Sequence, residues 1–170
     1  HNDPGCGLLS QGQIVLRMLV SLLVGLIIGY ERSYNLKPAG IRTYSLVCIG
    51  ATLFMIISVY GLPSLAYEFT GFRLDPGRVA AQIVTGIGFV GAGAIWKDRG
   101  NIRGLTTAAN LWVTAGLGMA VGLGMFFLTF VSVVCIFMAL YSSPLLCRLG
   151  LLKYPSDEEN TKSKHEDLTF

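Results

Sequence analysis

The chain has 170 residues, of which 52% are apolar and only 14% charged, and its formal net charge is +3. Because an ordinary soluble domain carries about 25% charged residues, this composition excludes a typical water-soluble protein and favours a helical membrane protein. The basic residues lie in short segments between apolar runs and not along one face, which argues against nucleic-acid binding.

Five apolar segments predict an all-α, polytopic transmembrane helical bundle over residues 13–143. Each approaches the roughly 17–25 residues that a helix needs to cross a bilayer. Residues 1–12 are expected to form a loose extracytoplasmic end. Residues 144–170 are expected to form a largely disordered cytoplasmic tail, with Pro144 ending the last span. The predicted spans are about 14–30, 43–60, 76–96, 105–122 and 125–141.

The first predicted span carries Arg17 near its outer end, where a long side chain can snorkel to the lipid headgroups. Ser21, Gly25, Gly29 and Ser33 follow at four-residue intervals, a spacing that lets another helix approach closely. We interpret this face as packing within the chain, with a dimer face as the alternative.

Helix-stopping residues close the second span at Gly61 and Pro63. The following segment, up to residue 74, has an amphipathic character that suits the membrane interface. Asp75 as N-cap and Pro76 as first helical residue then predict the start of the third helix.

The third helix contains the sequence GIGFVG at residues 86–91, which matches the G-x-G-x-x-G pattern of dinucleotide-binding proteins. That pattern requires a preceding strand and a βαβ unit, whereas here it lies inside an apolar span. We therefore interpret it as a surface for close helix packing. The glycines expected to serve helix packing are Gly25, Gly29, Gly86, Gly88, Gly91, Gly93, Gly118 and Gly122.

Lys and Arg residues are unevenly distributed between the two sides of the predicted bundle. With the N-terminus outside, ten of them fall on the inner side and three, Arg17, Arg73 and Arg78, on the outer side. The positive-inside rule therefore predicts an outside N-terminus and a cytoplasmic C-terminus.

An internal repeat with an offset of 64 residues is a further hypothesis. Both halves read as a span, a basic loop and a second span, and parallel repeats of this kind are related by an axis along the membrane normal. The alternative source of the matches is the Gly- and Ala-rich composition. The matched pairs are Gly29 with Gly93, Gly40 with Gly104, Ile41 with Leu105, Thr43 with Thr107, and Ala51 with Ala115.

Polar residues at the outer end of the third helix form a first candidate site. Asp75, Arg78 and Gln82 share one side of this helix. They fit either a capped helix start with an Asp75–Arg78 ion pair or an outward-facing polar pocket, because a charge exposed to lipid is unfavourable.

A second candidate site lies at the inner side. Glu31, directly after a glycine-spaced helix, is the strongest candidate for a functional carboxylate, and Arg42 or Arg103 is its expected partner across the repeat. Ordinary topology charges are the alternative explanation for the Lys and Arg residues. The inner candidates are Glu31, Arg32, Arg42, Asp98, Arg103, Thr106, Thr107 and Asn110.

No arrangement of side chains in the sequence supports hydrolysis, redox chemistry or phosphoryl transfer, so we do not expect an enzyme or a cofactor. The four cysteines include no C-x-x-C pair and no Cys/His cluster. The sequence therefore assigns no metal and predicts no disulfide framework.

Four sequence blocks, in this order, resemble the MgtC/SapB family of bacterial membrane proteins. They are GLIIGYER at 25–32, KPAGIRT at 37–43, DPGRVAAQIVTGIGFVGAG at 75–93 and GLTTAANLWVTAGLG at 104–118. The resemblance covers roughly residues 14–141. It implies a multi-pass protein of the bacterial inner membrane, linked to growth at low magnesium, survival inside host cells, or acid and stress responses.

The best-known branch of this family is thought to restrain the proton-translocating ATP synthase rather than to carry magnesium. That branch also has a soluble C-terminal domain, whereas this chain has a short charged tail, so a short SapB-like member is the nearer comparison. The resemblance implies the lipid bilayer and a membrane complex such as ATP synthase as partners, and self-association is a further option.

Two functions remain open at this stage. The first is a membrane regulator that binds another complex, which the scarcity of intramembrane acids favours. The second is a small transporter or channel for magnesium or protons, which glycine-interrupted helices and a repeat favour. The path of that transporter would be lined by Glu31, Asp75, Arg78, Gln82 and Asn110.

Overall fold

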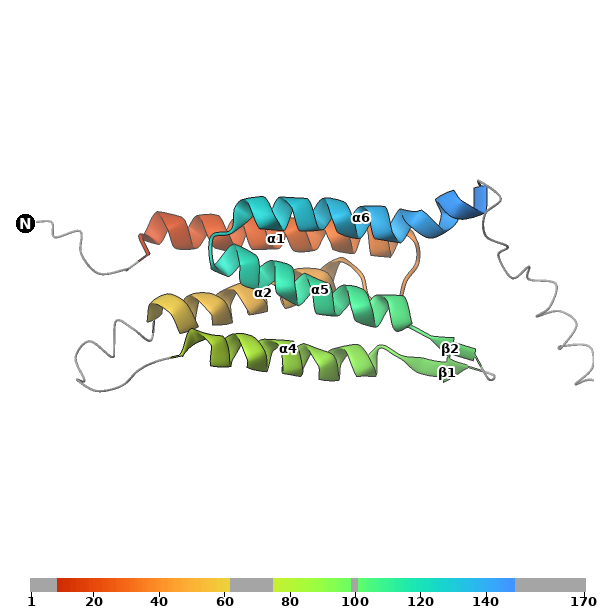
Figure 1. Ribbon diagram of the computed structural model, residues 1–170, viewed down its shortest axis with the longest axis horizontal. Helices are drawn as coiled ribbons and strands as arrows, with labels where there is room; N and C mark the ends of the chain where they lie inside the picture. The colour runs from red at the N-terminus through yellow and green to blue at the C-terminus, as the bar shows by residue number, and fades with distance from the viewer. Residues whose placement is uncertain (1–8, 62–74, 99–100, 149–170) are drawn as a thin grey trace, which may run out of the picture. The chain divides into compact units, whose positions relative to one another are not determined.

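The computed structural model describes residues 9–61, 75–98 and 101–148. These residues form five α-helices, one π-helical turn and one two-stranded hairpin (Figure 1). The chain divides into two compact units, His1–Val133 and Val134–Phe170. The predictions for the N-terminal end before residue 9, the amphipathic segment 62–74 and the tail from residue 149 lie outside the described residues.

Helix α1 spans Gln11–Tyr34 and begins with a capping box. The Ser10 side chain accepts a hydrogen bond from the Gln13 N–H, and the Gln13 side chain accepts one from the Ser10 N–H. Helix α2 spans Ile41–Ile56 and continues as the π-helical turn η1, Ile57–Gly61. Both α1 and the combined helix Ile41–Gly61 are long and apolar enough to cross a membrane.

Helix α4 spans Pro76–Gly93, and its start confirms the predicted cap, because the Asp75 carboxylate accepts a hydrogen bond from the Gly77 N–H at 2.9 Å. The sequence predicted that this helix ends near Trp96, but it already ends at Gly93. The chain instead forms strands β1, Trp96–Asp98, and β2, Asn101–Arg103, paired antiparallel. The fold is therefore mostly helical and not all-α.

Helix α5 spans Leu105–Gly122, as the sequence predicted for the fourth segment. Its N-cap, Gly104, has a φ of 91°, and a Cβ there would collide with the carbonyl group of Ala94. A glycine is needed at this position because other residues rarely adopt a left-handed backbone. The residue thus allows the short hairpin to turn directly into α5.

Helix α6 spans Phe126–Arg148 and continues past Pro144, where the sequence predicted its end. A proline removes one backbone hydrogen bond from a helix, and neighbouring groups in a membrane protein can compensate for that loss. By length and composition, only α1 and Ile41–Gly61 among the described helices qualify as full spans, with a shorter apolar segment at Phe126–Ser142. The five-span topology and its orientation remain predictions.

The first unit is built on α2 and α5, which pack against each other, with α1 against α2 and α4 against α5 (Figure 1). At the junction of α2, α4 and α5, Ala51, Ile87 and Ala115 form a hydrophobic cluster. Ala51 and Ala115 are one of the pairs of the predicted repeat, and α2 and α5 each begin directly after the glycine of another pair. This one matched pair therefore lies in the core of the unit.

Large apolar side chains lie on the surface as well as in the core, and several polar side chains are buried. Large apolar residues such as Leu19, Leu46 and Phe127 are exposed, whereas Thr52 and Thr114 are fully buried. Soluble proteins rarely expose so much contiguous apolar surface. The arrangement supports a location in the membrane, with polar groups directed into the bundle.

Candidate functional site

The last turn of α1 carries two adjacent charged side chains, Glu31 and Arg32, inside the bundle. Arg32 is 3% exposed and Glu31 is 9% exposed, and Arg32 Nη1 lies 3.8 Å from Glu31 Oε2. Taking an ion out of water costs several kcal/mol, which a close opposite charge and hydrogen bonds can offset. The two side chains therefore depend on each other for their burial.

The end of α1 also holds the carboxylate in place through Asn35. Its Nδ2 donates to Glu31 Oε1 at 2.7 Å and to the Glu31 carbonyl oxygen at 3.0 Å. A guanidinium at a helix C-terminus interacts favourably with the helix dipole, whereas a carboxylate does not. Asn35 and Arg32 thus stabilise Glu31 at a helix end that would otherwise disfavour it.

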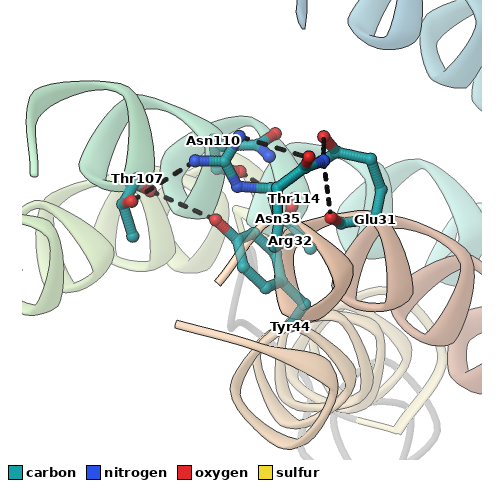
Figure 2. A network of polar contacts seen from close by, with 7 residues as sticks. All are labelled: Glu31, Arg32, Asn35, Tyr44, Thr107, Asn110 and Thr114. Atoms are coloured by element: carbon teal, nitrogen blue, oxygen red, sulfur yellow. Dashed lines mark hydrogen bonds and ion pairs between the residues drawn. The ribbon is translucent and has the colours of Figure 1, made fainter. Parts of the chain in front are cut away.

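Two other helices complete the arrangement (Figure 2). Arg32 Nη2 donates to Thr107 Oγ1 of α5 at 3.5 Å. The Tyr44 hydroxyl of α2 donates to the Thr107 carbonyl oxygen at 3.4 Å. Because Thr107 receives hydrogen bonds from both α1 and α2, this group joins three helices at one point.

On α5, Asn110 and Thr114 extend the polar surface. The Thr114 hydroxyl donates to the Asn110 carbonyl oxygen at 2.7 Å, and both residues are buried. We call the seven residues drawn in Figure 2 the charged cluster. They are Glu31, Arg32, Asn35, Tyr44, Thr107, Asn110 and Thr114.

Three buried atoms of the charged cluster have no hydrogen-bond partner within the described part of the chain. They are Glu31 Oε2, Arg32 Nε and Asn110 Nδ2. Leaving such a group unsatisfied costs about 1–3 kcal/mol. One acceptor and two donors together suit a small polar molecule that both donates and accepts hydrogen bonds. The described residues contain no group of three or more His, Cys, Asp or Glu side chains arranged to hold a metal ion.

The structure thus brings together four of the eight inner candidates: Glu31, Arg32, Thr107 and Asn110. The sequence predicted Arg42 or Arg103 as the partner of Glu31, but the carboxylate pairs with its own neighbour, Arg32. Arg42 lies exposed on α2 and Arg103 lies exposed on β2. Adjacent residues can pair here because both side chains point into the same narrow interior.

The outer candidates lie apart from the charged cluster, on α4. Asp75, Arg78 and Gln82 are all exposed in the described structure. Asp75 caps the helix through the Gly77 N–H, and within the described residues it forms no ion pair with Arg78. The capped helix start is observed, and neither Arg78 nor Gln82 points into the first unit.

The glycines singled out from the sequence fall into two groups. At Gly25, Gly29, Gly118 and Gly122, an added Cβ would lie 3.0 Å or less from atoms of a neighbouring helix. Gly91 lies at ordinary contact distance from Ala108. At Gly86, Gly88 and Gly93, an added Cβ would meet nothing within 4 Å.

The sequence did not single out Asn35, Tyr44 or Thr114. Thr114 could have been found, because Thr107, Asn110 and Thr114 follow at intervals of three and four residues and so share one helix face. Tyr44 gave no such signal, since an aromatic residue within an apolar run is typical of an ordinary core position.

Arg17 forms contacts within the chain that the sequence did not predict. Its Nη1 donates to the carbonyl oxygen of Gly122 at the end of α5. Its guanidinium lies over the Tyr60 ring, 4.9 Å from the ring centroid. Arg17 therefore caps a neighbouring helix, and its position relative to the lipid headgroups stays a prediction.

Comparison with known proteins identifies a family. The model of the MgtC family matches residues 18–149. No solved structure matches the chain. The family match includes the whole charged cluster and most of the described residues.

Curated relatives match over a shorter region. A protein of Escherichia coli K12 named "Putative magnesium transporter YhiD" is 47% identical over 115 residues, covering 67% of this chain and 53% of that protein. Protein MgtC of Salmonella typhimurium is 46% identical over 112 residues, covering 66% of this chain and 44% of that protein. An uncharacterized protein of Haemophilus influenzae is 38% identical over 136 residues, covering 79% of this chain and 57% of that protein. The chain thus spans about half the length of these relatives.

Proposed function

The chain belongs to the MgtC family, which confirms the resemblance seen in the sequence, and on this premise we propose that it is a non-enzymatic inner-membrane protein that modulates another membrane complex. In this proposal it supports adaptation to magnesium limitation or to acid and host stress. The observation that carries the proposal is the buried Glu31–Arg32 pair.

The Glu31–Arg32 pair suits a structural role better than a cation path. A divalent cation in a protein is bound by several oxygen ligands, commonly carboxylates. The Arg32 guanidinium lies 3.8 Å from the one carboxylate of the charged cluster. Two like unit charges about 4 Å apart near a protein surface repel each other by about 4 kcal/mol, so a cation at Glu31 would have to displace Arg32.

The same pair gives the first unit a fixed arrangement of helices. Through Arg32, Tyr44 and Thr107, the charged cluster connects α1, α2 and α5. A rigid bundle presents its outer faces in a constant geometry, which a protein that acts by binding another complex requires. The proton-translocating ATP synthase is the partner that the family resemblance suggests.

The proposal includes the five-span topology with the N-terminus outside and a location in the bacterial inner membrane. It is supported by the two long apolar helices and by the exposed apolar surface of the first unit. The distribution of Lys and Arg supports the orientation.

A flux measurement tests the proposal. The purified protein is reconstituted into liposomes loaded with a magnesium-sensitive or a pH-sensitive dye. We expect no more flux than in empty liposomes, and we expect an affinity-tagged chain to co-purify with a membrane complex from native membranes. Flux that Glu31→Gln abolishes, and that the exposed-site control Arg42→Gln leaves unchanged, would overturn it.

The alternative function is a small magnesium or proton transporter. Two observations favour it: the buried Glu31 Oε2 accepts no hydrogen bond from the described residues, and the name of one relative refers to magnesium transport. Under this alternative, the flux of magnesium or protons is robust. Asn110→Leu lowers this flux because the Asn110 Nδ2 lies in the same charged cluster as Glu31. The flux assay separates the two functions without knowledge of the partner.

A further inference from the structure

Helix α4 presents one face that no described residue covers. Five residues on this face follow at intervals of seven, four, three and four positions, which places them in one line along the helix. They are Asp75, Gln82, Gly86, Phe89 and Gly93. All five are exposed, and Phe89 is 84% exposed. We call this line the α4 seam.

Lipid is a poor cover for the α4 seam. A side-chain amide such as that of Gln82 has two donors and an acceptor, and lipid tails offer no hydrogen-bond partner. Arg78, one turn away at the start of the helix, adds a charge that is unfavourable in the membrane. Polar groups on the outer face of a membrane helix therefore favour contact with another protein helix.

We propose that the α4 seam is a self-association surface, on which two copies of this chain pack α4 against α4 in parallel about a two-fold axis along the membrane normal. This inference goes beyond the proposed function and does not depend on it. A two-fold interface must be complementary to itself, because each contact occurs twice. The α4 seam meets that requirement at three levels.

At the start of the helix, Asp75 and Arg78 carry opposite charges, are exposed, and form no ion pair with each other among the described residues. In a parallel pair, the two copies of Asp75 and Arg78 lie at the same level, so each Asp75 carboxylate is within reach of the Arg78 guanidinium of the other copy and two ion pairs form across the axis. One helical turn further on, the Gln82 amide both donates and accepts hydrogen bonds and can therefore pair with its own symmetry mate.

Near the middle of the helix, Phe89 lies between two glycines of the same line, Gly86 and Gly93. In parallel packing of this spacing, each side chain inserts between residues one turn before and one turn after it on the facing helix. The Phe89 ring of one copy then lies between Gly86 and Gly93 of the other. At both glycines an added Cβ meets nothing within 4 Å in the single chain, so this space is open to a second copy.

Photo-crosslinking in native membranes tests the contact. Phe89 is replaced by the photoreactive amino acid p-benzoylphenylalanine, and the control carries it at Leu23, which is 56% exposed on α1. We expect light to convert the Phe89 variant, but not the Leu23 variant, into a product of twice the chain mass. A product that contains a different protein, or lipid adducts alone, would overturn the proposal.

A matched pair of substitutions tests the geometry. Gly86→Ile and Gly88→Ile both place a side chain in open space, so each should leave the single chain folded, but only Gly86 lies on the α4 seam. Energy transfer between labelled copies in liposomes, titrated against lipid, measures the dimer. We expect Gly86→Ile to weaken association more than about tenfold and Gln82→Leu about fivefold, with Gly88→Ile unchanged. Equal effects of the two glycine substitutions, or no association at any lipid ratio, would contradict the proposal.

Discussion

The two helix pairs related by the predicted repeat, α1 with α2 and α4 with α5, use their glycines differently. In the first pair, a Cβ added at Gly29 would lie 2.6 Å from the Cα of Ile41, so the two helices are in backbone contact. In the second pair, Gly93 holds the equivalent position, and a Cβ there would meet nothing within 4 Å. A glycine at the same place in a repeat can therefore serve a closed contact in one half and leave an open surface in the other.

The two pairs also differ where their first helices end. Glu31 and Arg32 occupy the positions that Ile95 and Trp96 occupy one repeat later. The charged residues are buried and paired, whereas Ile95 and Trp96 are partly exposed. The first pair is thus joined by a close backbone contact at Gly29 and by a buried charge pair. In the second pair, α4 meets α5 only at ordinary contact distance, at Gly91, and no buried charge pair is found among the described residues of its two helices.

The largest expected effect is at the charged cluster. Arg32→Leu leaves the Glu31 carboxylate buried without its opposite charge, and we expect a loss of about 3–5 kcal/mol in stability. Trp96→Leu, at the equivalent position of the second pair, should change stability by about 0.5 kcal/mol or less, as for a surface substitution. Thermal unfolding of the purified protein in detergent measures both. Similar losses for the two variants would show that the pairs are equally fixed.

The next effect concerns the glycines. Gly29→Leu forces α1 away from α2, and overpacking of this kind costs about 1–3 kcal/mol. Gly93→Leu meets open space in the single chain and should leave the unfolding temperature of the monomer nearly unchanged. The comparison between closed and open faces would fail if Gly93→Leu destabilised the monomer as much as Gly29→Leu does.

The smallest effect separates two threonines. The Thr52 hydroxyl of α2 donates to the Gly118 carbonyl oxygen of α5 at 2.8 Å, a contact between helices. The Thr85 hydroxyl of α4 donates to the Ala81 carbonyl oxygen of its own helix. Thr52→Val should lower stability by about 0.5–1.5 kcal/mol, the net contribution of one hydrogen bond. Thr85→Val removes no contact between helices and should show a smaller change in the same unfolding assay.

Local sequence patterns predicted those features that depend on neighbouring residues. Asp75 followed by Pro76 located the start of α4, and the limits of α5 agreed with the apolar segment 105–122. The inner candidates included Glu31, because it directly follows a glycine-spaced helix, and Arg32 beside it.

Features that depend on the facing helix could not be predicted in this way. The ion-pair partner of Glu31 depended on which basic side chain reaches the interior of the helix bundle. Tyr44 joined the charged cluster only because α2 packs against α5. Likewise, Gly29 and Gly93 are glycines at matched positions of the predicted repeat. Only the element that faces each glycine decides whether it is covered. The hairpin after α4 was missed because two strands of three residues give too short a pattern to recognise.

The hydrogen bond from Arg17 to the Gly122 carbonyl oxygen joins residues separated by 105 positions, and this has a consequence for biosynthesis. A chain emerges from the ribosome N-terminus first, so α1 is made long before the carbonyl group that its arginine binds. Until then, the ring of Tyr60, in the π-helical turn that ends the second helix, is available to the guanidinium. We expect α1 and α2 to associate early and the arginine to be secured only when α5 is complete, so that nascent chains arrested before residue 122 keep Arg17 accessible to water-soluble reagents.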